Sequence, residues 1–101
     1  MKYDNRRRYR PELPVIYILE AFDKKTELLA KSYMLQKIEL SFLRELMEIN
    51  MDHHNPLYLD LMACFDLTRN QIHSLMAYID VKHHQEIDFE LYDYQLQGEE
   101  S

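Results

Sequence analysis

The sequence predicts an α+β fold, with about four strands in a small antiparallel or mixed β-sheet and two α-helices packed on one face of the sheet. Three observations support this fold class. Two segments repeat apolar residues at helical spacing, four others have the composition or alternation of strands, and the links between the segments are short. The resulting order along the chain is ββαβαβ. At 101 residues, the chain has the length of a single domain.

The first two elements are predicted to form a β-hairpin. Residues 14–22 (PVIYILEAF) are rich in β-branched and aromatic residues, and because both faces are apolar we expect a central strand. The short polar link DKKT favours an antiparallel partner over residues 26–35, although the leucines and alanine of that segment also suit a helix. We interpret it as a strand, with Leu29, Tyr33 and Leu35 sharing one face.

Two helices are predicted from the spacing of apolar residues. The first covers residues 42–49, with Ser41 as its expected N-cap. The second runs from residue 69 to about residue 80, because Thr68 and Gln71 have the spacing of a capping box. Its apolar stripe consists of Ile72, Leu75, Met76 and Ile79.

The other two strands are predicted at residues 56–65 and 87–96. The first, PLYLDLMACF, also suits a short helix, and its aromatic residues favour a strand. It contains the single cysteine, Cys64, which we expect to be buried and unreactive. The second, IDFELYDYQL, alternates apolar and acidic residues but reverses its phase after Leu91, which predicts a β-bulge or a bend there.

The charge is divided unevenly along the chain. Residues 1–10 hold five bases and one acid, whereas the other 91 residues hold seven bases and 17 acids. The early residues are polar, and prolines interrupt any helix across the junction. We therefore expect a flexible basic arm at residues 1–13, a single α+β domain at residues 14–97 and an acidic tail at residues 98–101. An acidic body repels nucleic acid and attracts a basic protein.

The sequence offers little for catalysis or cofactor binding. The histidines occur as two adjacent pairs and one single residue, and adjacent histidines rarely converge on one metal ion. No nucleophile or acid–base pair is recognisable, and the single glycine, Gly98, excludes a glycine-rich phosphate loop. We therefore expect no enzyme, no metal and no cofactor. One cysteine and the lack of a secretory signal favour the cytoplasm.

The acidic and aromatic residues near the C-terminus form the candidate binding site. Residues 86–101 hold six acids and no base. Tyrosine is enriched in binding hot spots, and carboxylates steer association with a basic partner. The alternative is a solvated strand face with its tyrosines packed in the core. The candidate contact residues are Asp88, Glu90, Tyr92, Asp93, Tyr94 and Glu99.

Three segments make a pattern that spans roughly residues 14–97. VIYILEAFDKKTELLAKSYML is followed by a helix, then by PLYLDLMACFDLTRNQIHSLMAYI and finally by IDFELYDYQL. This pattern, from an EAFDK-T-LL hairpin to a terminal F-YDY-L strand, resembles a family of small bacterial immunity proteins that accompany polymorphic toxins, including contact-dependent growth inhibition systems. The sequence departs from the family pattern at residues 56–65, and at Gln95, where an aromatic residue is usual.

The resemblance implies a cytoplasmic inhibitor that binds the C-terminal toxin domain of a cognate effector and blocks its active site. Many such effectors are nucleases, including ones that cleave tRNA, and some act together with a translation factor. An alternative comes from the arm itself. Its segment NRRRYR, residues 5–10, combines bases with the aromatic Tyr9, which suits a small RNA-binding regulator.

Overall fold

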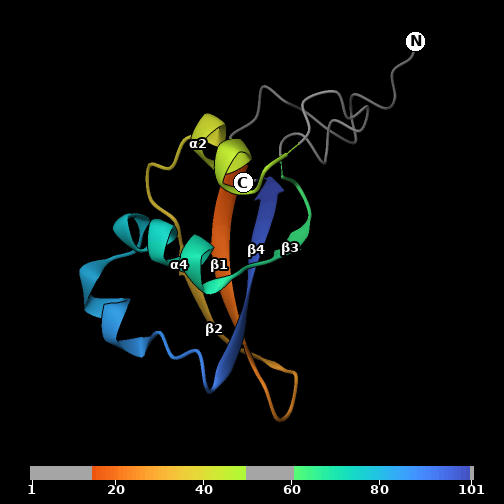
Figure 1. Ribbon diagram of the computed structural model, residues 1–101, viewed down its shortest axis with the longest axis vertical. Coiled ribbons are helices and arrows are strands. Elements are labelled where there is room, and N and C mark those ends of the chain that lie inside the picture. The colour runs from red at the N-terminus through yellow and green to blue at the C-terminus, as the bar shows by residue number, and fades with distance from the viewer. Residues whose placement is uncertain (1–14, 50–60, 101) are drawn as a thin grey trace.

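A four-stranded antiparallel sheet with the strand order β2-β1-β4-β3 forms the centre of the structure (Figure 1). The structure is a computed structural model, and it describes residues 15–49 and 61–100. Strand β1 (Val15–Asp23) pairs with β2 (Leu29–Met34) on one side and with β4 (Tyr92–Glu100) on the other. The short strand β3 (Cys64–Asp66) pairs with the far side of β4. The predicted α+β class is confirmed, and so is the central position of the first strand.

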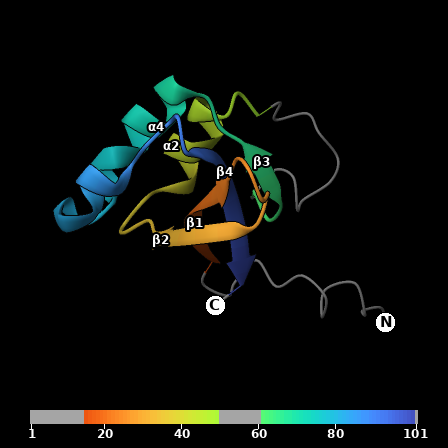
Figure 2. The same cartoon turned by 90° about the horizontal axis from the view of Figure 1, so that it is seen from below.

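The helices lie together on one side of the sheet, as Figure 2 shows. They are α2 (Leu40–Leu46) and α4 (Arg69–Leu75), and α4 ends about five residues before its predicted end. The 3-10 helix η1 (Met76–Tyr78) follows α4 directly, and a second 3-10 helix, η2 (Val81–Glu86), begins after Ile79 and Asp80. This arrangement confirms the prediction that the helices pack on a single face of the sheet.

No described helix is long and apolar enough to cross a membrane.

The core lies between this helical layer and the sheet. Leu19 in the middle of β1 is fully buried and stands opposite Tyr33 of β2 and Leu96 of β4. The helices contribute Leu43, Ile72 and Leu75, all with at most 1% of their surface exposed. Side chains alternate across a strand, so the residues between the buried ones point to the opposite face of the sheet.

Local signals fixed the start of one helix but not of the other. The hydroxyl of Thr68 accepts a hydrogen bond from the Gln71 amide, and the Gln71 side chain accepts one from the Thr68 amide, so the predicted capping box is confirmed. The expectation for Ser41 was wrong. The N-cap of α2 is Glu39, without a side-chain hydrogen bond, because a turn at Lys37 (φ 58°) directs the chain into the helix before Ser41 is reached.

The last strand begins later and ends later than predicted. Residues 87–91 are not a strand, because the Asp88 carboxylate accepts hydrogen bonds from the amides of Glu90 and Leu91 and closes a turn. This turn, rather than a bulge within a strand, explains the reversal of phase after Leu91. At the other end, residues 98–100 pair with β1, so the predicted acidic tail from residue 98 is part of the sheet up to Glu100.

The third strand is also displaced from its predicted position. Of the predicted range, residues 56–60 lie outside the described residues, and the strand itself is only Cys64–Asp66. Phe65 packs against the core, whereas Cys64 is exposed and hydrogen-bonds to the Gln97 side chain. The expectation of a buried cysteine was therefore wrong, because Cys64 faces away from the helices. The predicted basic arm, residues 1–13, lies outside the described residues.

Candidate binding surface

The face of the sheet opposite the helices is the candidate binding surface, and we call it the outer face. No described helix covers it (Figure 2). The alternation that places Tyr17, Leu19 and Ala21 in the core places the other residues of β1 on this face. The outer face consists of Ile16, Ile18, Glu20 and Phe22 from β1, Leu29, Ser32 and Met34 from β2, Asp93, Gln95, Gln97 and Glu99 from β4, and Cys64 and Asp66 from β3.

Apolar and acidic side chains are neighbours across the strands of the outer face. Phe22 of β1 stands opposite Asp93 of β4, and Ile16 stands opposite Glu99. Directly opposed residues on antiparallel strands have Cβ atoms about 4.5–5.5 Å apart. The outer face therefore combines contact area from β1 with negative charge from β4, a mixture that suits a protein partner.

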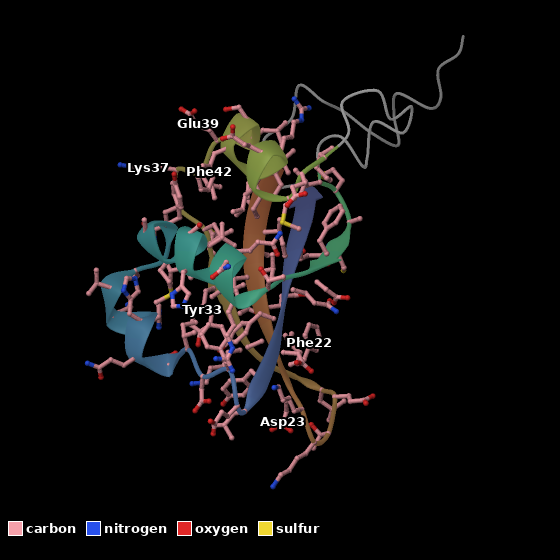
Figure 3. All side chains as sticks on the ribbon, viewed as in Figure 1. Phe22, Asp23, Tyr33, Lys37, Glu39 and Phe42 are labelled. Carbon is pink, nitrogen blue, oxygen red and sulfur yellow. The ribbon has the colours of Figure 1, made fainter. Side chains whose placement is uncertain are left out.

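A hollow of about 530 Å³ lies where the outer face meets the β1–β2 turn. Figure 3 shows Phe22 on the side of the sheet away from the helices and Asp23 at the lower end of the sheet, by the β1–β2 turn, whereas Tyr33 lies on the helical side. We call this feature the acidic hollow, since four of its lining residues are carboxylates beside the apolar Phe22 and Leu67. The carboxylates are those of Asp23, Glu27, Asp66 and Asp93.

Hydrogen bonds hold two of these carboxylates in place. Asp23 Oδ1 accepts the backbone amides of Thr26, at 3.0 Å, and Lys25, at 2.7 Å, and these bonds lower the pKa of Asp23 below its ordinary value. Asp66 Oδ1 accepts a hydrogen bond from the Gln95 side-chain amide at 3.0 Å. The hollow thus presents oriented negative charge to an approaching cation.

One lysine lies close to the acidic hollow. Lys24 Nζ is 3.9 Å from Asp93 Oδ1, and 43% and 74% of the two side chains are exposed. An exposed ion pair at this distance contributes little, and a partner's arginine or lysine can replace it at small cost. The region remains net negative.

The predicted contact residues do not form a single surface. Asp93 and Glu99 are exposed on the outer face. Asp88 and Glu90 lie in the turn before β4, where the Asp88 carboxylate binds backbone amides. They are therefore separate from the outer face.

The two tyrosines of β4 belong to the helical side of the sheet. Tyr94 is 4% exposed, and its hydroxyl accepts a hydrogen bond from the Asp88 amide at 2.9 Å. Tyr92 packs edge-on against Tyr94, with the ring centroids 6.2 Å apart. The expectation that Tyr94 contacts a partner is corrected, because its position in the alternation of β4 points it into the core.

Sequence reasoning missed the contribution of β1 and β3 to this surface. Phe22, Glu20 and Asp66 were not among the candidates, although the apolar second face of residues 14–22 was visible in the sequence. A sheet with helices on one side leaves that second face without an internal partner. The half-buried Ile16 and Ile18 show the consequence, since the described helices do not cover them.

The carboxylates of the outer face do not form a metal centre. No group of three or more histidine, cysteine, aspartate or glutamate side chains in the described ranges is arranged to hold a metal ion. The chemistry that the arrangement offers is recognition by charge and apolar contact.

Residues 16–97 match the family known as domain of unknown function DUF7683, and the chain belongs to this family. The matched range begins inside β1 and ends inside β4, so it contains the whole sheet except the terminal residues of these strands. No curated protein and no solved structure matches the chain significantly.

Proposed function

We propose that this chain is an immunity protein, a non-enzymatic inhibitor that binds the C-terminal toxin domain of a cognate effector in the cytoplasm. The toxin is a nuclease, with tRNA as one candidate substrate, delivered by a contact-dependent growth inhibition system. The resemblance of residues 14–97 to such immunity proteins supports this proposal. The single observation that carries it is the outer face, which places carboxylates and apolar side chains together without a described helix above them.

The charge of the outer face suits a nuclease as the partner. A nuclease holds the phosphates of its substrate with lysine and arginine, so its active-site surface is basic. Carboxylates such as Asp66 and Asp93 can compete with phosphate for those cations, while Phe22 supplies apolar contact. When the nuclease is bound over the acidic hollow, this chain would cover the basic surface of the nuclease and keep nucleic acid away from it.

Co-purification tests the proposal. The chain is expressed with the toxin domain encoded immediately upstream, and a tagged copy is recovered at moderate salt. A stoichiometric complex that abolishes toxicity and nuclease activity is the expected result. Absence of a complex, together with co-purified RNA that is lost when residues 1–10 are removed, would contradict the proposal and assign the function to the segment NRRRYR.

A further inference from the structure

The outer edge of β2 presents backbone groups that no described strand pairs. The strand order places β2 at the edge of the sheet. The Leu35 amide donates to the Tyr17 carbonyl at 2.9 Å, so alternation turns the amides and carbonyls of Ser32 and Met34 away from β1. The Gln36 amide also faces outward, and it donates to the Tyr78 carbonyl of η1 at 2.8 Å. The edge can therefore accept further hydrogen bonds.

A groove runs beside this edge. Two adjoining hollows of about 200 Å³ and about 400 Å³ share Gln36, Ile79 and Asp80 among their lining residues. One wall is the edge of β2, with Ser32 and Met34, and the other is the segment that joins η1 to η2. We call this feature the edge groove. The edge groove therefore lies along the outer edge of β2, which no described strand pairs.

Two of the exposed apolar residues line the edge groove. Met34 on β2 is 57% exposed, and Val81 on the facing wall is 76% exposed. Solvent-exposed sheet edges are usually kept polar, short or covered, because an apolar open edge pairs with other chains. Exposed apolar side chains on both walls therefore favour binding at this edge.

Two features restrict pairing to the C-terminal half of β2. Ala30 is skipped in the pairing of β1 with β2, so a bulge interrupts the first half of the strand. Lys31 points toward the helical side, where its Nζ lies 3.6 Å from Glu86 Oε1. An inward charge and a bulge both protect an edge from uncontrolled association. The open stretch is then Ser32 to Met34, because the Gln36 amide already donates to the Tyr78 carbonyl.

The charges beside the open stretch select the occupant. Lys37 and Lys82 line the two hollows and make no ion pair within the described part of the chain. The carboxylate of Asp80, which accepts the Lys82 amide at 3.1 Å, also lines both hollows, so the two lysines and this carboxylate leave one net positive charge beside the open stretch. A second copy of this chain would bring the same lysines and a net charge of −6 to the contact, so charge favours a different partner.

We propose that the edge groove binds an extended segment of a partner protein, which adds to β2 as an antiparallel strand. The segment has apolar side chains at alternate positions and carboxylates at its N-terminal end. In an antiparallel arrangement that end lies beside Lys37 and Lys82. The proposal does not rest on the immunity function, because the edge groove and the acidic hollow have different lining residues.

A synthetic peptide tests the edge groove directly. The probe is an acetylated octapeptide that begins with two glutamates and continues with alternating valine and threonine, with a fluorescent label at its C-terminal end. Fluorescence anisotropy with the wild-type chain is expected to show saturable binding. Ser32→Pro removes an outward amide without touching the pairing with β1, and it should weaken binding about tenfold or more. Ser32→Ala keeps the amide and is the matched control.

Two further comparisons keep the test independent of the folding of the proline variant. Replacing Lys37 and Lys82 with Glu should weaken the binding of the acidic peptide and strengthen the binding of a version that begins with two lysines. Lys25→Glu in the β1–β2 turn should change the affinity of neither peptide. N-methylation of the valine amides in the probe should abolish binding to the wild-type chain. The proposal is overturned if the unmodified probe does not saturate, if N-methylation has no effect, or if sedimentation shows a wild-type dimer that Ser32→Pro makes monomeric.

Discussion

Among single residues, Gly98 occupies a position where the packing leaves no room for a side chain. A Cβ atom built on Gly98 would lie 1.9 Å from the carbonyl oxygen of Leu61, which is itself fully buried. We expect Gly98→Ala to lower the free energy of unfolding by about 1–3 kcal/mol, because the backbone around Leu61 must move. Urea denaturation measures the change. Glu99→Ala, on the neighbouring outer-face position, is the control, and equal stability of the two variants would disprove the close approach.

The carboxylates of the acidic hollow support a prediction about the speed of binding. Replacing Asp66 and Asp93 with Lys should slow association with the cognate toxin domain by about tenfold, because charges on a binding surface act mainly on the association rate. Stopped-flow or surface-based kinetics at several salt concentrations measures this effect. Glu45→Lys changes an exposed acid on α2, away from the outer face, and should leave the rate unchanged. If the variant with Lys at positions 66 and 93 associates as fast as the Glu45→Lys control, the binding site lies elsewhere on the molecule.

Single residues also show how far the candidate site could be predicted. Asp93 and Tyr94 are adjacent in the sequence, and the alternation within β4 places them on opposite faces of the sheet. The sequence does not state which of these faces the helices cover, so both residues appeared available to a partner. Asp88 was predicted to lie in the last strand, whereas its carboxylate closes the turn that precedes β4.

Among the elements, α4 has the strongest local signal and supports a stability prediction. Thr68 Oγ1 accepts a hydrogen bond from the Gln71 backbone amide at 3.2 Å, and Gln71 Nε2 donates to the carbonyl of Leu46, the last residue of α2, at 3.2 Å. Thr68→Ala should cost about 1 kcal/mol of unfolding free energy, as the loss of an N-cap usually does. Thr68→Ser should restore most of it, and Ser74→Ala, at an exposed helical position, should have little effect. Thermal and urea unfolding distinguish these outcomes.

The elements that could be predicted are those specified by their own residues. The helix at 69–75 and the hairpin of β1 with β2 follow from caps, periodicity and a short turn. The strand predicted at 56–65 had no such signal, and within its described part, residues 61–65, Cys64 and Phe65 are the residues that pair with β4. Its position depends on contacts between residues more than 30 apart in the sequence, such as Phe65 opposite Leu96. Local propensity does not carry that information.

At the scale of the whole molecule, the strand order is the property that the sequence did not predict. Short links favoured an antiparallel or mixed sheet without specifying its strand order, and in the structure β4, the last element, is inserted between β1 and β3. This insertion forms the outer face, because it brings the carboxylates of β4 beside the apolar residues of β1. The α+β class followed from the residues themselves, whereas the binding surface follows from a long-range pairing.

A polar cluster joins the sheet to η2 and couples the stability of the molecule to pH. The Tyr33 hydroxyl donates to Glu86 Oε1 at 2.9 Å, and His83 Nδ1 lies 3.3 Å from Glu86 Oε2. The hydrogen bonds from Tyr33 and then His83 lower the pKa of Glu86 from its ordinary value of 4.5. Burial, followed by the hydrogen bond to Glu86, raises the pKa of Tyr33 above its ordinary value of 10.0.

These two shifts predict loss of stability at both ends of the pH range. Glu86 has a lower pKa in the folded state, so its contribution is present above 4.5 and is lost as the pH falls through the folded value. Tyr33 has a higher pKa in the folded state, so its contribution is complete below 10.0 and is lost as the pH rises toward the folded value. The urea midpoint should therefore be level between about pH 5 and about pH 9 and fall on either side. Glu86→Gln should weaken the loss of stability at acid pH, and Tyr33→Phe should weaken the loss at alkaline pH. Burial also raises the pKa values of Tyr17 and Tyr94, so these two tyrosines account for the alkaline loss that remains in Tyr33→Phe. An acid limb unchanged in Glu86→Gln, or an alkaline limb unchanged in Tyr33→Phe, would show that this cluster does not couple the fold to pH.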